Sequence, residues 1–155
     1  MKTTIVTIAL CLGFTIANAQ QVKETEVPAT VKQGFEKKYP GAKVEKWEKE
    51  GADFEAEFHL NKVESSAVFE ANGTFKELEQ EIKTSELPKT ATEYCTKNFK
   101  DHKLSEAAKI TDAAGKLCYE AEVKTGKEEM DLLFDEKGNF LKKTVEAPEK
   151  GDKKD

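Results

Sequence analysis

Apolar and polar residues follow two different periods in the first half of the chain. Within residues 27–40, apolar residues recur every four positions at Val31, Phe35 and Tyr39, which is typical of a helix with one buried face. A Pro-Gly pair then ends the helical pattern. From 44 to 82 the period changes to two, with apolar residues alternating with charged ones. This part of the chain therefore predicts one helix followed by amphipathic strands.

The same scheme restarts at Leu87 and continues to the end of the strand pattern. The second helical stripe repeats the first one 60 residues later, and the strand Tyr119–Val123 repeats Phe54–Phe58 65 residues later. The five additional residues fit a longer segment from Lys109 to Lys116, which contains a turn-like Asp-Ala-Ala-Gly sequence. The residues of the second stripe are Ala91, Cys95 and Phe99.

One seven-residue phrase, F-[DE]-x-x-G-x-F, occurs in both halves. It spans Phe69–Phe75 and Phe134–Phe140, and its glycine suits the positive φ angle of a tight turn. The sequence thus predicts a tandem duplication in which each half, about 26–83 and 86–146, is one helix followed by four antiparallel strands. A half of this size has a marginal core, so we expect an α+β fold with the helices on one face of a continuous sheet.

The two ends of the chain are predicted to lie outside this fold. Residues 1–19 combine Lys2, an apolar stretch and an Ala-Asn-Ala site, which together are typical of a secretory signal peptide cleaved near Ala19. The protein should then be periplasmic or secreted, without a membrane span. Residues 20–146 form the predicted single domain, and the charged residues 147–155 are predicted to be a disordered tail.

Composition and motifs argue against several classes of function. The chain has a net charge of -5 and 25 lysines but no arginine, which disfavours nucleic acid as a partner. It has no G-x-S-x-G elbow and no metal-ligand spacing, so we expect no enzyme, metal or cofactor. Cys95 and His102 are the nearest nucleophile–base pair, but Cys95 fits a buried helix position better and His102 fits a surface loop.

The two cysteines of the predicted mature chain, Cys95 and Cys118, have opposite placements. Cys95 belongs to the helical stripe, whereas Cys118 alternates with Tyr119 and should face away from the helices. The sheet would then separate the two sulfur atoms. Because exported cysteines often pair, a disulfide stays open as the alternative.

Candidate binding residues lie on the predicted sheet face opposite the helices. Glu55 and Glu57, with Glu120 and Glu122 at equivalent places, would form an acidic surface, and Trp47 could supply an aromatic anchor. Such a face suits a protein or peptide partner of the cell envelope. A small ligand or cation is the alternative, and so is a face of glutamates that are simply solvated.

Trp47 is also open to a second interpretation. On a regular strand, Val44 and Trp47 cannot both point inward, because they are three positions apart and side chains alternate between the two faces. A β-bulge between them would place both on the helix side. Trp47 then belongs to the core.

The motifs together resemble those of the PepSY-like family, exported bacterial proteins, mostly of Bacteroidota, that are called β-lactamase-inhibitor-like. The resemblance rests on V-P-x-x-V-x-x-x-F-x-x-x-Y-P at Val27–Pro40, Trp47, F-E-A-x-F at Phe54–Phe58, the repeated turn and the second Leu-Pro start. It implies a tandem fold like that of β-lactamase inhibitory protein. Together with the predicted open sheet face it favours a non-catalytic binding or inhibitory module, which we expect to be a monomer. The second half departs from the pattern, with Lys100 and Ala107 at the places of Pro40 and Trp47.

Overall fold

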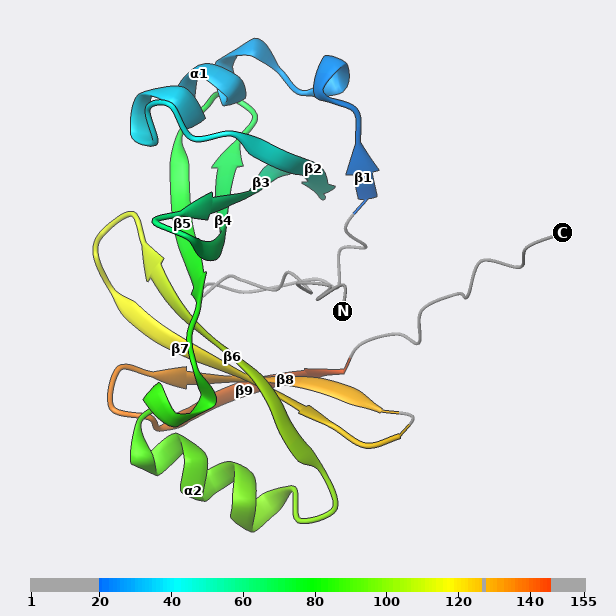
Figure 1. The fold of residues 1–155 in the computed structure, drawn as a ribbon, viewed down its shortest axis with the longest axis vertical. Coiled ribbons are helices and arrows are strands. Elements are labelled where there is room, and N and C mark those ends of the chain that lie inside the picture. The colour runs from blue at the N-terminus through cyan, green and yellow to red at the C-terminus, as the bar shows by residue number, and fades with distance from the viewer. Residues whose placement is uncertain (1–19, 127, 146–155) are drawn as a thin grey trace, which may run out of the picture. The chain divides into compact units, whose positions relative to one another are not determined.

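The computed structural model describes residues 20–126 and 128–145. The predicted signal peptide at 1–19 and the predicted tail at 147–155 lie outside the described residues. The described strands form a nine-stranded antiparallel sheet in chain order, and two α-helices complete an α+β fold (Figure 1). The elements are β1 Gln20–Val22, η1 Glu24–Glu26, α1 Ala29–Lys38, β2 Val44–Glu50, β3 Asp53–Leu60, β4 Val63–Glu70, β5 Phe75–Glu81, η2 Thr84–Glu86, α2 Lys89–Asn98, β6 Lys103–Asp112, β7 Leu117–Lys124, β8 Glu129–Asp135 and β9 Phe140–Val145.

The chain divides into two compact units, which are described separately. Unit 1 comprises the residues up to Glu81 together with Lys109–Leu117, and unit 2 comprises Ile82–Ala108 and the residues from Cys118 onward. Strand β1 was not anticipated, because its sequence QQV is polar and only three residues long. It forms through backbone pairing with β2, with Val22 opposite Trp47.

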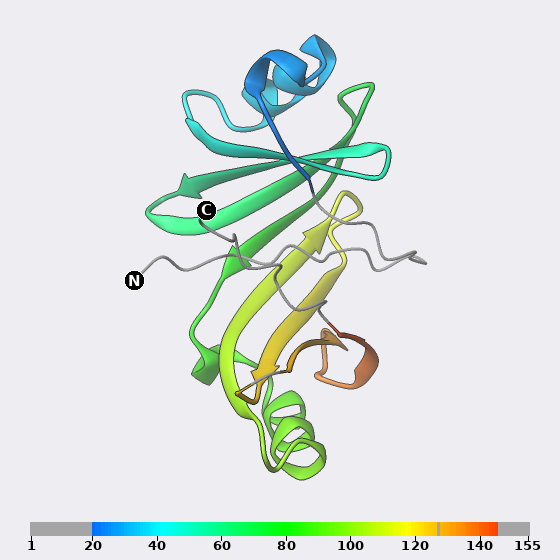
Figure 2. The same ribbon diagram turned by 90° about the vertical axis from the view of Figure 1, so that its right-hand side faces the viewer.

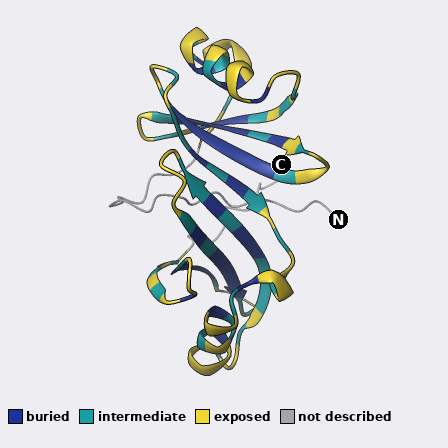
Figure 3. Ribbon diagram, turned by 90° about the vertical axis from the view of Figure 1, so that its left-hand side faces the viewer, coloured by how far each residue is buried: buried dark blue, intermediate teal, exposed yellow. Residues whose placement is uncertain are grey.

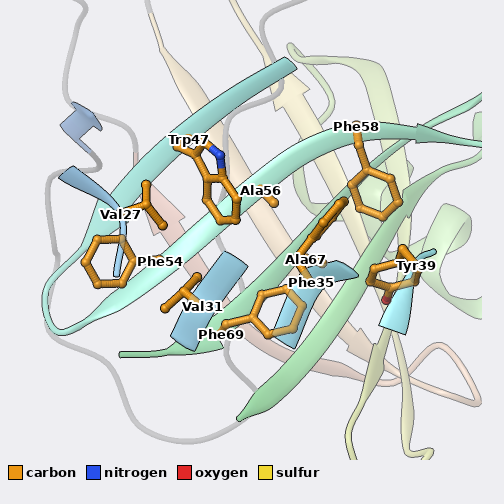
Figure 4. Close-up of a cluster of buried hydrophobic side chains, with 10 residues drawn as sticks. All are labelled: Val27, Val31, Phe35, Tyr39, Trp47, Phe54, Ala56, Phe58, Ala67 and Phe69. Carbon is orange, nitrogen blue, oxygen red and sulfur yellow. The ribbon is translucent and has the colours of Figure 1, made fainter. Parts of the chain in front are cut away.

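Helix α1 covers one face of the unit 1 strands, as the four-residue stripe predicts (Figure 2). Val31, Phe35 and Tyr39 are all buried against the sheet, and the Phe35 ring centroid lies 5.0 Å from that of Phe58 (Figure 4). The rings meet edge to face, a favourable arrangement for aromatic pairs. The aromatic core around α1 therefore buries apolar surface that stabilises this unit.

The Tyr39 hydroxyl is an unsatisfied polar group in this core. It is buried, and it has no hydrogen-bond partner among the described residues. Burial also raises the pKa of Tyr39 to about 12. Since phenylalanine stands at the matching position of the second stripe, we predict that Tyr39→Phe raises the free energy of unfolding by about 1 kcal/mol. Urea denaturation of both proteins tests this, and a less stable variant would show that the hydroxyl is satisfied in solution.

The repeated turn docks onto the start of a helix in each unit. Gly73 has φ +89° and Gly138 has φ +81°, as the sequence predicts. A Cβ atom on Gly73 would clash with the carbonyl oxygen of Thr30, and one on Gly138 would lie 2.9 Å from the backbone nitrogen of Ala91. Glycine is thus needed at both places for its conformation and for its lack of a side chain.

Helix α2 packs on the unit 2 strands around a second core. Cys95 is buried there, and burial raises the pKa of its thiol to about 11, so the group stays protonated at neutral pH. The structure forms no disulfide between Cys95 and Cys118. The surface placement predicted for His102 is wrong, because its ring lies edge to face against Phe99 with both nitrogens buried.

Candidate functional site

The strands of unit 1 carry charged side chains on the face opposite α1, which we call the acidic face. Antiparallel pairing aligns these side chains in rows across β2, β3, β4 and β5. One row is Glu48, Glu55, Val68 and Glu77, and the next is Lys46, Glu57, Ser66 and Glu79. Glu50, Asp53 and Lys76 extend the same surface.

Two lysines form ion pairs with some of these carboxylates. Lys46 Nζ lies 2.7 Å from Glu48 and 2.8 Å from Glu57, and Lys76 Nζ lies 2.6 Å from Asp53. Burial opposes the charge of Lys46, but its hydrogen bonds to both glutamates outweigh that effect and raise its pKa. The two lysines therefore fix the carboxylates around them in defined positions.

The acidic face is more buried than the sequence suggested. Glu55 is 0% exposed and Glu77 is 2% exposed, whereas a solvated face would leave their carboxylates in water. Glu57 retains more contact with solvent, with a side chain that is 17% exposed. Among the strands of this unit, β3 and β4 carry most of the buried residues, which are dark blue in Figure 3. The expectation of an open, solvated acidic surface is therefore wrong for Glu55.

Burial and neighbouring carboxylates raise the pKa of Glu50 from its ordinary 4.5 to about 7. Burial is the main cause, followed by the charges of Glu48, Glu77 and Asp53, and Lys76 offsets them only in part. A raised carboxyl pKa means that the folded state resists ionisation of this group. Glu50 is therefore protonated in a substantial fraction of molecules at neutral pH.

This shift predicts a pH dependence of stability. The contribution of Glu50 is fully present below pH 4.5 and is lost as pH rises through 7, because the unfolded chain ionises more easily. Allowing for partial exposure, we expect the loss to be on the order of 1–2 kcal/mol between pH 5 and pH 8. Glu50→Gln should remove that part of the slope. Urea denaturation at both pH values tests it, and an unchanged slope in the variant would refute the assignment.

Unit 2 carries a second charged cluster on the equivalent face of β7 and β8. Glu122 accepts a hydrogen bond from Ser105 Oγ and lies 2.8 Å from Lys124 Nζ, which also lies 3.2 Å from Glu129. Burial opposes ionisation of Glu122, but hydrogen bonds from Glu129, Lys124 and Ser105 lower its pKa. The shared hydrogen bond with Glu122, together with burial, raises the pKa of Glu129 to about 7. Glu129 is therefore protonated more readily than Glu122 and donates the hydrogen bond between the two carboxyl groups.

The predicted site residues divide between these two clusters and the core. Glu55 and Glu57 lie together on the acidic face of unit 1, and Glu120 and Glu122 lie on the equivalent face of unit 2. Glu120 is 7% exposed and Glu122 is 5% exposed, so the solvated interpretation is also wrong for them.

Trp47 lies in the hydrophobic core on the helix side of the sheet. It is 6% exposed, and its ring centroid lies 5.9 Å from that of Phe35 (Figure 4). The register of β2 and β3 shifts between Val44 and Lys46, which is the bulge that the core interpretation requires. The placement of Trp47 on the acidic face is therefore wrong.

Sequence reasoning missed several members of the acidic face. Glu77 and Glu79 alternate with Leu78 on β5. The sequence pattern of this strand is less clear, because the pairing of β4 with β5 changes register between Val68 and Phe69. Lys46 and Glu48 were missed for the same reason, since the bulge reverses which residues of β2 face the helix. A glutamate at every second position of β5 was the signal that could have revealed the full row.

The described residues lack two further kinds of feature, a metal-binding cluster and a membrane-spanning helix. Between 20 and 126 and between 128 and 145, no group of three or more His, Cys, Asp or Glu side chains is placed to hold a metal ion. In the same ranges, neither helix has the length and apolar character needed to span a bilayer.

Comparison with solved structures shows which fold the chain shares. A DUF2874 family protein from Bacteroides uniformis is similar over 76% of this chain and 88% of its own, with a TM-score of 0.66 and 16% identity. A protein from Bacteroides eggerthii, described as a "putative periplasmic" protein, covers 77% and 88%, with a TM-score of 0.66 and 18% identity. A BLIP-like protein from Bacteroides fragilis covers 79% and 94%, with a TM-score of 0.59 and 20% identity. At these identities the likeness establishes the fold alone.

The sequence also matches a family model over most of its length. No curated protein matches the chain. The family described as "Putative beta-lactamase-inhibitor-like, PepSY-like" matches residues 15–65 and 54–142. These two overlapping ranges include both helices and nearly all of the strands. The chain therefore belongs to the PepSY-like, β-lactamase-inhibitor-like family.

Proposed function

We propose that the chain is an exported, non-catalytic binding or inhibitory module that recognises a protein or peptide of the cell envelope. The observation that carries this proposal is the acidic face, where carboxylates of β2, β3 and β5 lie in ordered rows and the side chains of Lys46 and Glu57 remain 27% and 17% exposed. Lys46 holds two of them in place, which preorganises the surface for a complementary partner. Family membership and the BLIP-like structural neighbour support a binding role.

Glu57 is the residue best suited to test this surface. It belongs to the second row, retains some exposure and accepts a hydrogen bond from Lys46 at 2.8 Å. Glu57→Gln removes its charge but keeps its shape. The matched control is Glu36→Gln, which removes an exposed carboxylate from α1.

The experiment begins with affinity capture from an envelope extract, using residues 20–155 as bait. The captured protein is then purified and titrated against the native chain and both variants. We expect Glu57→Gln to weaken binding by about 5- to 10-fold and Glu36→Gln to leave it unchanged. A partner that binds all three proteins equally would place the interface elsewhere, and the absence of any reproducible partner would count against a binding module.

Export is the second part of the proposal. The signal-like sequence at 1–19 and the description of the B. eggerthii neighbour support it. Fractionation of the source cell should recover the protein from the periplasm or medium, with Gln20 as its first residue. A cytoplasmic protein that retains Met1 would refute export.

We also infer that residues 20–146 are one domain made of two repeats, 26–83 and 86–146. The order of a 3₁₀ turn, an α-helix and four strands occurs twice among the described elements, which supports this inference. A single domain should unfold in one transition. Trp47 fluorescence reports on unit 1 and thiol labelling of Cys95 reports on unit 2, and two separate midpoints would indicate two domains.

A further inference from the structure

Strand β9 is the last strand of the described sheet. It pairs with β8 on one side, and no other described strand pairs with its outer side (Figure 1). An edge strand presents alternate backbone N–H and C=O groups to its surroundings, which an additional strand can bind. The strand at the other end of the strand order, β1, has only three residues and therefore offers a shorter backbone for pairing. Strand β9 thus offers six residues of backbone for pairing.

The side chains of β9 also favour an added strand. Among the described residues, Val63, Leu141 and Val145 are the exposed large hydrophobic side chains, and two of these three lie on β9. Leu141 is 48% exposed because the β8–β9 register shifts beside it and leaves it without a residue directly opposite. Val145 is 53% exposed at the end of the strand. These apolar surfaces would be covered by side chains of an extended partner.

The positive charge of Lys143 favours an acidic partner for this edge. Lys143 is exposed between the two apolar residues and lies two positions from Val145 on the same strand face. A second copy of the chain, paired antiparallel through β9, would bring Lys143 close to its own counterpart, and like charges opposite each other are unfavourable. A strand with carboxylates would instead pair favourably.

We propose that the outer edge of β9 binds an acidic, extended peptide segment by strand addition. Backbone hydrogen bonds provide the pairing, a carboxylate of the peptide lies beside Lys143, and an apolar side chain two residues away lies beside Val145. The alternation of acidic and apolar residues is the expected recognition signature. This site is separate from the acidic face and does not depend on it.

The probe is a short capped peptide of alternating glutamate and valine, titrated against residues 20–155 by fluorescence anisotropy. A peptide with lysine in place of each glutamate tests the charge, and one with alternate backbone amides N-methylated tests the pairing. The protein variants are Lys143→Glu and the control Lys89→Glu, which reverses a charge on a side chain of α2 that is 89% exposed. Hydrogen exchange over 140–145 locates the bound peptide.

We expect the acidic peptide to bind and to protect the amides of 140–145. Lys143→Glu should weaken it by about 5- to 10-fold, and Lys89→Glu should leave it unchanged. Both control peptides should bind much more weakly. Equal binding by the N-methylated peptide, equal effects of the two protein variants, or a dimer in which 140–145 are already protected would each overturn the proposal.

Discussion

Gly73→Ala is expected to destabilise the protein far more than Gly115→Ala. The two glycines have φ angles of +89° and +82° and occupy turns with the same backbone hydrogen bonds, so the conformational strain is similar. Only Gly73 approaches a helix, where an added Cβ would clash with the Thr30 carbonyl oxygen. Gly115 has open space around it. We expect a loss of about 1–2 kcal/mol for Gly115→Ala and about 3–5 kcal/mol for Gly73→Ala.

Equilibrium urea denaturation of the two variants and the native chain measures both effects. Because the glycines belong to the same unit, the difference between the variants isolates the contact with α1 from the backbone strain. Equal losses would mean that the turn does not dock on the helix in solution. Gly34→Ala approaches the same contact from the helix side, since its added Cβ would meet the carbonyl group of Gly73.

Trp47→Ala is expected to destabilise unit 1 by about 3–5 kcal/mol, because it removes a buried aromatic side chain from the core. Trp47→Phe keeps much of the apolar volume and should be milder, at about 1–2 kcal/mol. Thermal denaturation followed by circular dichroism measures both changes. A native-like melting temperature for Trp47→Ala would show that the ring is not part of the core.

This prediction changes how a loss of binding should be read. If a partner no longer binds Trp47→Ala, the cause is loss of the fold rather than loss of a contact. Glu57→Gln avoids this ambiguity, because its side chain lies on the opposite face of the sheet. The two variants together separate an unfolded protein from an altered surface.

The helices and the repeated turns could be predicted because each depends on local chemistry. The stripe of Val31, Phe35 and Tyr39 specifies one helix face, and the glycine of each repeated turn specifies a positive φ. Alternation on β3 likewise placed Glu55 and Glu57 on the face away from α1. These features need only the neighbouring residues to define them.

Other features depend on contacts between distant residues. Strand β1 exists through its pairing with β2, and its own sequence has no strand pattern. The bulge after Val44 decides the side of Trp47, and the alternation of residues alone permits both sides. Burial of Glu55 likewise depends on tertiary contacts, since charged residues are usually exposed. The sequence therefore placed the four glutamates on the right strands and faces, but it did not predict their burial or the core position of Trp47.

The segment Asp112–Lys116 has the same turn geometry as the two repeated turns. Its first and fifth residues share a backbone hydrogen bond of 3.0 Å, as Asp135 and Asn139 do at 2.9 Å. A Cβ atom added to its glycine would meet no atom within 4 Å, whereas one added to Gly73 or Gly138 would meet the start of a helix. A motif search that counts [DE]-x-x-G segments would therefore report four copies, ending at Gly51, Gly73, Gly115 and Gly138, although the described residues form only two α-helices. Comparisons among such chains should instead count the glycines that contact a helix. Each of these glycines is constrained both by the positive φ of its turn and by the helix at the start of the same repeat.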